Sequence, residues 1–433
     1  MKTFNRLIAT LLLSFAVTAV YGHTREEQQA AEKQTAYTVI ANPGEVAARS
    51  IRINWHTDLK SGDSYCYYTK RTDTNWKKVK AVKAHQELCT AYDSLYSQKA
   101  SGEDFYEKAR FLRNTVELDN LKPDTEYMYR VGSSNEGEIR YFKTAPKSGE
   151  WSAAVISDFH AYTPLPKRVE SAMSMLSTLE GCNGGDFDWI LHGGDICAWG
   201  GSYSFWRDLY SQPYFAKYMW AGVNGNHDNM SRKYIKVSNQ FFRYANNNPG
   251  NGYEGEEGVC YHFTYANTLF IMLNSESMRS DEGLAKAQQW VRKVIEENPA
   301  RFVVVVEHYQ WFLARNGNTS QYARWNKLFD ECGVDLAIGA NNHIYARTNA
   351  LYQGRETDGT KGTVYIQTPS SDNERGQGLK EWTDNKDIIK IRWSEGAKTV
   401  GALLLKGDNK KLELTLYDRN GKALDSVAVK AKR

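Results

Sequence analysis

Aspartate, histidine and asparagine residues follow several apolar runs after residue 150, each at the point where the run ends. The runs read VISDFH, ILHGGD, AGVNGNHD, VVVVEH and AIGANNH, and their polar residues include Asp158, His160, Asp195, Asn226, His227, Asp228, His308 and His343. Open α/β sheets bind ligands at the carboxyl ends of their strands, so these side chains can converge although they lie far apart in the sequence. The pattern predicts a metal cluster.

These residue types suit hydrolysis at phosphorus. Imidazole and carboxylate ligands hold divalent metals while leaving positions open for water and phosphate oxygens. Asp195 can bridge two ions because a carboxylate has two oxygens, and two ions about 3.5–4 Å apart can clamp the attacking and leaving oxygens of an in-line displacement. We therefore expect a dinuclear centre in which a metal-activated water attacks a phosphate ester.

The elements that position these residues form an α/β domain. After Trp151, apolar strands alternate with helical segments. Strands are predicted at 151–157, 188–192, 218–223, 269–274, 301–308 and 334–339, helices at 167–181, 283–298 and 320–333, and closing strands at 363–368, 400–406 and 411–418.

The preceding region, from residue 35 to about 144, has the period-two alternation of short strands. In SIRINWHT, Ile51, Ile53 and Trp55 share one face. The stretch LKPDTEYMYRVG resembles the penultimate strand of a fibronectin type III domain, with Tyr127 or Tyr129 in the corner-tyrosine role. This region offers no chemistry of its own, and TAPKSGEW links it to the α/β domain.

Composition and the N-terminal residues indicate an exported, soluble protein. The formal net charge of +4 argues against a nucleic-acid polymer as partner. Residues 1–22 have the layout of a signal peptide, and no other stretch is apolar enough to span a membrane, so we expect a secreted or periplasmic protein. The six cysteines permit disulfides, and Cys66 with Cys89 is the pair we expect.

The ordered set D-x-H, G-D, G-N-H-D, V-x-x-H and x-H-x-Y-x-R resembles the calcineurin-like metallophosphoesterase superfamily, and the β domain in front makes the chain most similar to purple acid phosphatases. The resemblance implies an N-terminal all-β, fibronectin type III-like sandwich over 35–146. An α/β metallophosphoesterase domain over 150–433 would follow, with two β-sheets flanked by helices and with the closing strands included.

The resemblance also implies two divalent or trivalent metal ions (iron, zinc or manganese) and a small phosphorylated substrate. The first ion would be held by Asp158, His160, Asp195 and His343, and the second by Asp195, Asn226, His308 and the residue at 341. His227 would lie outside the metal ligands and act as general acid for the leaving alkoxide or hold the phosphate, and Asp228 would fix its imidazole.

Two positions depart from the pattern of purple acid phosphatases. Ala198 stands where these enzymes have a tyrosine ligand, and Asn341 replaces a histidine ligand of the second metal. Asparagine can coordinate through its amide oxygen, so we expect a retuned and weaker second site. Phosphodiester hydrolysis, and a non-catalytic binding protein whose metal site has decayed at Asn341, are the alternatives.

Other histidines and aromatic residues near the motifs have less specific interpretations. His192, His262, His56 and His85 are expected to be packing residues rather than ligands. Trp199, Tyr203, Trp206, Tyr309 and Trp311 flank the motifs and fit a pocket wall or ordinary packing equally well.

Overall fold

The computed structural model describes residues 36–95, 105–162, 166–230, 239–313, 320–372, 376–379 and 384–432. The predicted signal peptide over residues 1–22 lies outside this range and stays a prediction, which the intact mass of the purified protein tests. Within the described residues, no helix has the length and apolar character needed to cross a membrane.

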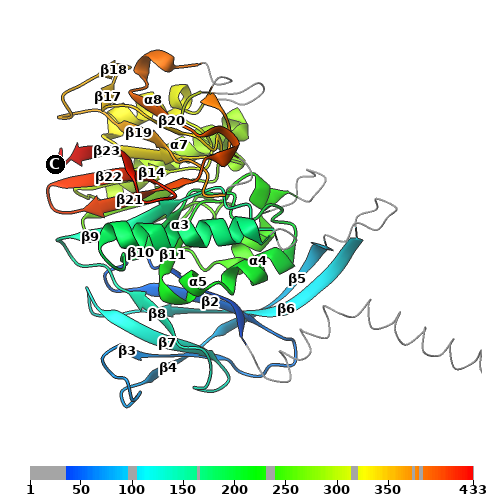
Figure 1. Ribbon diagram of the computed structural model, residues 1–433. Coiled ribbons are helices and arrows are strands. Elements are labelled where there is room, and N and C mark those ends of the chain that lie inside the picture. Colours follow the sequence, from blue (N-terminus) through cyan, green and yellow to red (C-terminus); the bar gives the residue numbers. More distant parts are fainter. Residues whose placement is uncertain are drawn as a thin grey trace, which may run out of the picture.

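Two large β-sheets form the centre of the α/β half (Figure 1). The first has the order β23 (Ala423–Lys430), β22 (Lys411–Asp418), β21 (Gly401–Gly407), β9 (Trp151–Ile156), β10 (Trp189–His192), β11 (Met219–Gly222), β1 (Tyr37–Pro43), β2 (Ile51–Thr57), β6 (Phe105–Leu118) and β5 (His85–Leu95). The second has the order β12 (Tyr261–Tyr265), β13 (Thr268–Met272), β14 (Phe302–Val306), β15 (Leu336–Gly339), β19 (Val364–Gln367), β16 (Tyr345–Arg347) and β20 (Ile391–Trp393).

Helices cover the outer face of each sheet, which completes the predicted αββα arrangement. The first sheet carries α3 (Lys167–Asn183), α4 (Tyr203–Tyr210), α5 (Pro213–Lys217) and α6 (Gln240–Ala245), and the second carries α7 (Asp281–Glu297) and α8 (Tyr322–Cys332). Val155 of β9 and Val304 of β14 belong to the core between the sheets, whereas Ala154 and Val305 pack under the helices. Both faces of the strands are buried, which is why their sequences are continuously apolar.

The strands that carry the site run parallel. β10 pairs in parallel with β9 and β11, and β14 pairs in parallel with β13 and β15.

The predicted strands and the three long predicted helices are all present. The short helices α4, α5 and α6 were not predicted, because eight, five or six helical residues show too little periodicity to distinguish them from loops.

The N-terminal region is the predicted all-β sandwich, drawn in blue and cyan at the bottom of Figure 1. Strands β1, β2, β6 and β5 lie over a separate sheet with the order β4 (Lys80–Lys83), β3 (Tyr65–Lys70), β7 (Glu126–Gly132) and β8 (Arg140–Lys143). β1 also pairs in parallel with β11, with Ala41 opposite Met219. The first sheet therefore continues across the predicted boundary between residues 146 and 150, and the boundary and the fibronectin type III relationship stay predictions.

The expected disulfide between Cys66 and Cys89 is wrong. All six cysteines are free. Cys66 on β3 is buried between the two sheets of the sandwich, whereas Cys89 on β5 packs with Phe111 on the opposite face of the first sheet. The side-chain alternation of β5 therefore turns Cys89 away from Cys66.

Tyr127 takes the corner-tyrosine role. Its hydroxyl accepts a hydrogen bond from the backbone N–H of Lys122 at 2.9 Å, which ties β7 to the turn before it. Within the described part of the chain, the hydroxyl of Tyr129 has no hydrogen-bond partner although the residue is fully buried.

Tyr127→Phe should lower the free energy of unfolding by about 1 kcal/mol, because it removes a hydrogen bond and leaves the N–H of Lys122 without that partner. Tyr129→Phe is the matched control and should leave stability unchanged or raise it, since it deletes a buried hydroxyl that makes no hydrogen bond. Urea midpoints of the two variants measure the difference. Equal losses would contradict the corner assignment.

Candidate metal centre

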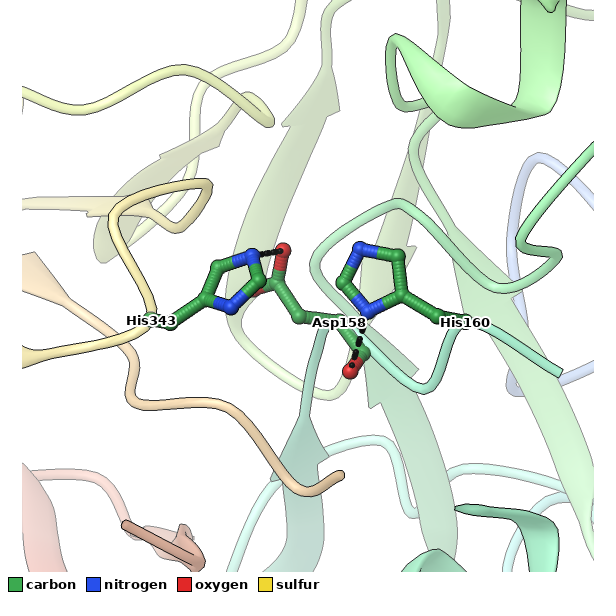
Figure 2. Close-up of side chains that lie close together, drawn as sticks. All are labelled: Asp158, His160 and His343. Carbon is green, nitrogen blue, oxygen red and sulfur yellow. Dashed lines mark hydrogen bonds and ion pairs between the residues drawn. The ribbon is translucent and has the colours of Figure 1, made fainter. Parts of the chain in front are cut away.

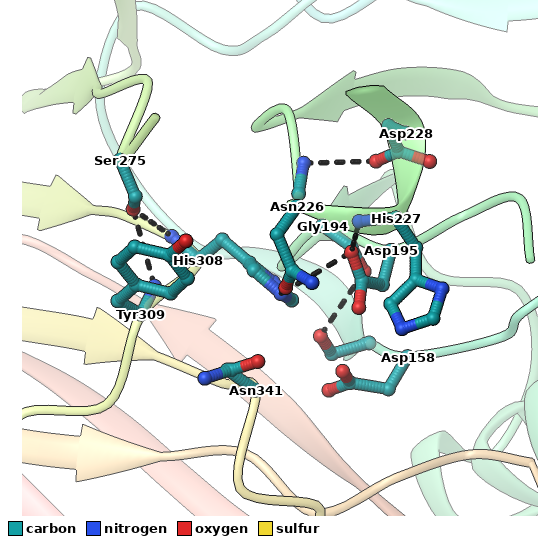
Figure 3. Close-up of polar contacts among 12 residues, drawn as sticks. Asp158, Gly194, Asp195, Asn226, His227, Asp228, Ser275, His308, Tyr309 and Asn341 are labelled. Atoms are coloured by element: carbon teal, nitrogen blue, oxygen red, sulfur yellow. Dashed lines mark hydrogen bonds and ion pairs between the residues drawn. The ribbon is translucent and has the colours of Figure 1, made fainter. Parts of the chain in front are cut away.

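The predicted metal ligands converge at the carboxyl ends of the parallel strands. Three overlapping groups have ligand atoms within 4.8 Å of one another: Asp158, His160 and His343; His160, Asp195 and His227; and Asp158, Asp195 and His308. All of these residues are buried. Figure 2 shows the first group, with the imidazoles of His343 and His160 on either side of Asp158. Figure 3 shows Asp195 between His308, His227 and Asp158.

Five residues of the site have a left-handed backbone conformation, which sets the direction of their side chains. The residues Asp158, His160, Asp195, Asn341 and His343 have φ values of 53°, 46°, 53°, 64° and 58°. These residues lie in the loops that follow β9, β10 and β15. This conformation costs a histidine roughly 1–2 kcal/mol, whereas aspartate and asparagine adopt it more readily. The strain therefore lies at His160 and His343, and backbone strain of this kind clusters at functional sites.

Main-chain carbonyls fix the orientation of three imidazoles. The Nδ1 atom of His160 lies 3.0 Å from the carbonyl of Asp158, that of His308 lies 2.8 Å from the carbonyl of Gly193, and that of His227 lies 2.8 Å from the carbonyl of Ala198. Because a carbonyl only accepts, each Nδ1 carries the proton. Each Nε2 is then the available acceptor, which is how proteins prepare a histidine to bind a metal.

The Nε2 atoms face other acceptors. His160 Nε2 lies 3.2 Å from Asp195 Oδ2, and His308 Nε2 lies 3.3 Å from Asp195 Oδ1 and 3.1 Å from Asn226 Oδ1. His343 Nε2 lies 3.4 Å from Asp158 Oδ1. Lone pairs opposed at these distances repel, so a proton or a metal cation has to lie between them.

The charges show how strongly the centre attracts a cation. Burial alone lowers the pKa of His308, but the charge and hydrogen bond of Asp195, the charge of Asp158 and the carbonyl of Gly193 raise it to about 10. Burial raises the pKa of Asp195, but its histidine neighbours hold it well below its usual range. The ionised, buried carboxylate favours whichever cation occupies the site, and metal ions compete with protons for such ligands. The donor set therefore fits metal ions.

Glycines let the loops approach this closely. Gly194 has φ of 98°, and a Cβ at this position would lie 2.4 Å from His308 Nδ1. A Cβ at Gly225 would lie 2.2 Å from Asp195 Oδ1. The repeated glycines of the motifs are thus required by space as well as by backbone conformation.

Two neighbouring asparagines have different environments. Asn341 Nδ2 donates to Gln310 Oε1 at 2.6 Å, and Figure 3 shows its amide oxygen turned toward Asp158 and Asp195. Asn342 instead donates to the carbonyls of Phe312 and Leu313 and supports that loop. The placement agrees with Asn341, rather than Asn342, as the second-site residue.

The predicted role of Asp228 in fixing His227 is wrong. The Asp228 carboxylate accepts hydrogen bonds from the backbone N–H groups of Cys197 at 2.9 Å and Gly225 at 2.8 Å, while the carbonyl of Ala198 holds the His227 ring. Burial and the charge of Asp195 raise the pKa of Asp228 to about 7. Asp228 therefore joins two site loops, because the 3-10 turn His227–Asn229 directs consecutive side chains to different sides.

The expected packing role of His85 is wrong, because its side chain is exposed, and His262 is only half-buried. His192 and His56 are packing residues, as expected. Burial lowers the pKa of each to about 3, and both are hydrogen-bonded within the core. Among the flanking aromatics, Tyr203, Trp206 and Trp311 are core residues. The rings of Trp199 and Tyr309 lie 5.3 Å from His227 and 5.9 Å from His308, so these two border the site.

Sequence reasoning missed residues that hold the ligands. Gln310, Gly193 and the carbonyl of Ala198 contact predicted ligands, and Ser275 accepts from the backbone N–H groups of His308 and Tyr309 at 3.1 Å (Figure 3). Closeness in sequence to His308 could have drawn attention to Gln310. No signal in the sequence identifies Ser275.

Comparisons with known proteins match both halves of the chain. Residues 36–144 match the family model described as the purple acid phosphatase N-terminal domain, and residues 152–345 match calcineurin-like phosphoesterase. The chain is 25% identical to probable purple acid phosphatase 20 of Arabidopsis thaliana, over 64% of this chain and 65% of that protein. It is 24% identical to acid phosphatase type 7 of Mus musculus, over 72% of this chain and 76% of that protein. The match thus spans slightly less than two thirds of the Arabidopsis relative.

Solved structures share the fold. Purple acid phosphatase PPD1 from yellow lupin (Lupinus luteus) seeds superposes with a TM-score of 0.69 at 15% identity, covering 91% of this chain and 74% of that chain. PhoD superposes with a TM-score of 0.57 at 13% identity, covering 90% of this chain and 91% of that chain. Both likenesses extend over the N-terminal sandwich and the α/β half together.

Metal binding to the metal-depleted protein at pH 7 should release about one proton from His308, whose pKa of about 10 keeps it protonated until a cation takes its place. The affinity for the metal ion should increase roughly tenfold for each unit by which the pH is raised toward 10. Above pH 10 it should level off, because His308 has already lost its proton. Calorimetric titration in buffers of different ionisation enthalpy measures the release. A binding enthalpy independent of the buffer would contradict it.

Proposed function

Because residues 152–345 match the calcineurin-like phosphoesterases and residues 36–144 match the N-terminal domain of purple acid phosphatases, we propose that the chain is a metal-dependent hydrolase of phosphomonoesters. The observation that carries the proposal is the orientation of His160 and His308. A main-chain carbonyl fixes each Nδ1 and turns each Nε2 toward the same fully buried aspartate, Asp195.

The proposed ligands divide into two sets that share Asp195. Asp158, His160, Asp195 and His343 would hold the first ion, and Asp195, Asn226, His308 and Asn341 would hold the second. The distances from Asp195 Oδ2 to His160 and from Oδ1 to His308 support this division, because the two carboxylate oxygens face different imidazoles. Bound ions would supply an acidified water as nucleophile and would neutralise charge on the phosphoryl oxygens.

His227 is the proposed general acid. Its Nδ1 donates to the carbonyl of Ala198 in either charge state, so the ring keeps its orientation while Nε2 gains and loses a proton. The Nε2 side faces the centre, where a departing alkoxide would need that proton. The ring of Trp199 lies beside it, with the two ring centroids 5.3 Å apart. Because its ligand atom also groups with His160 and Asp195, metal content is the measurement that separates an acid from a ligand.

A binding protein with a decayed metal site is the rival of a different class. Decay would relax the features that only ligand geometry requires, such as the left-handed backbone at the histidines His160 and His343. Their presence favours an active centre.

Comparing hydrolysis of 4-nitrophenyl phosphate with hydrolysis of bis(4-nitrophenyl) phosphate distinguishes a monoesterase from a diesterase at the same site.

Asp195→Asn should reduce hydrolysis of 4-nitrophenyl phosphate more than any other single ligand substitution, because one change weakens both sets of ligands. It should also lower the content of both metals, measured by elemental analysis after purification without chelator. Unchanged hydrolysis and unchanged metal content would contradict the dinuclear assignment.

His227→Ala should leave metal content unchanged and slow turnover of an alkyl phosphate by roughly 10²–10⁴-fold, the usual contribution of general acid catalysis. The loss on 4-nitrophenyl phosphate should be smaller, because its acidic phenol leaves without a proton. His85→Ala, an exposed position in the N-terminal sandwich, is the control. Equal losses on the two substrates, or loss of metal, would remove His227 from the acid role.

A further inference from the structure

Gln310 lies outside every proposed ligand set and yet contacts one of its members. It lies two residues after His308 in the loop that follows β14, is 1% exposed, and accepts a hydrogen bond from Asn341 Nδ2 at 2.6 Å. The protein has an asparagine at this ligand position where the resemblance expects a histidine. Unlike an imidazole, an amide group has one end, the oxygen, that binds a cation and another end, the NH₂ group, that repels it. The orientation of the amide therefore decides whether it can serve as a ligand.

The surroundings of the contact are rigid. The backbone N–H of Ala340 donates to the carbonyl of His308 at 3.0 Å, which joins the ends of β14 and β15. The carbonyl of Gln310 accepts from the N–H of Gln321 at 3.0 Å. Asn342 bonds to the carbonyls of Phe312 and Leu313, so the segments 308–313 and 340–342 are connected at several points. The relative position of the two amides is therefore set by the fold.

We propose that Gln310 is a positioning residue that turns the amide oxygen of Asn341 toward the second metal site. This inference rests on the proposed function and concerns one feature of it. With Gln310 Oε1 accepting from Nδ2, the oxygen of Asn341 faces Asp158 and Asp195, as Figure 3 shows. The reverse orientation would bring two carbonyl oxygens together at the Gln310 contact, or would turn the Asn341 NH₂ group against the cation if both amides rotated.

The resulting donor set has a distinct chemical character. Asp195, Asn226 and Asn341 would supply oxygens and His308 the only imidazole, whereas the first set has two imidazoles and two carboxylates. Oxygen-rich sets suit Mn²⁺ and Mg²⁺, and neutral amides attract a cation less than a carboxylate does. The second site should therefore fill after the first, and its affinity should depend on how well the amide is oriented.

Titration of the metal-depleted, full-length protein with Mn²⁺, followed by the electron paramagnetic resonance signal of free Mn²⁺, measures both binding steps directly. Gln310→Leu removes the acceptor and should weaken the second step by roughly 10–100-fold, the usual effect of losing a partner of a metal ligand. Gln310→Glu keeps an acceptor and no donor, so the second step should be at least as tight as in the unmodified protein. The first step should change little in both variants.

The Asn341→Asp variant tests whether Gln310 acts by orienting residue 341 or only by packing against it. The carboxylate of Asn341→Asp has two equivalent oxygens and needs no orientation. Gln310→Leu should therefore change the second step by less than about threefold when it is added to Asn341→Asp, on the same scale of partner effects. A loss of equal size in both backgrounds, or no loss in either, would overturn the inference.

The outcome also distinguishes this inference from the proposed function. If the unmodified protein binds Mn²⁺ at two sites and hydrolyses 4-nitrophenyl phosphate while Gln310→Leu leaves the second step unchanged, only the role of Gln310 fails. If the unmodified protein binds no second cation, the dinuclear function fails and the inference fails with it.

Discussion

The buried negative charge of Asp158 and Asp195 is the constraint on which the rest of the site depends. Both carboxylates are fully buried or nearly so, at 0% and 1% exposure. Ionised groups in such surroundings require a compensating positive charge close by. The histidines surround them with acceptor nitrogens instead of fixed positive charges, so the compensation has to come from bound protons or metal ions. The fold therefore forms a cation site whose ligands cannot all be satisfied by one another.

The residues that form this buried, charged site come from both sheets of the α/β half. Asp158, His160 and Asp195 come from the ends of β9 and β10 in the first sheet, and His308, Asn341 and His343 follow β14 and β15 in the second. The core between the sheets, with Val155 and Leu191 facing Val304 and Ile338, holds the two strand edges together. Any change in the packing of the sheets would alter the distances across the site, so core stability and metal geometry are coupled.

The fold and most of the site were predictable from the sequence for a physical reason. Strands buried on both faces are apolar along their whole length, so each polar residue such as Asp158 or His308 marks a strand end that faces the ligand side. What the sequence did not show depends on side-chain direction. Asp228 follows His227 directly but bonds to the N–H groups of Cys197 and Gly225, and Cys89 faces away from Cys66. Such directions follow from the local turn and from strand register, which residue types alone do not specify.

The N-terminal sandwich contributes to the centre although it brings no ligand. β11, which leads into Asn226 and His227, is hydrogen-bonded to β10 on one side and to β1 on the other. Further along the chain, Asn42 accepts from the N–H of Asn247 at 2.8 Å, and Arg113 donates to the carbonyl of Asn246 at 2.7 Å. Without the sandwich, β11 would be an open edge with unpaired N–H and C=O groups. The sandwich therefore braces the strand from which the proposed acid and one second-site ligand are presented, and its sheet is part of the α/β half in structural terms.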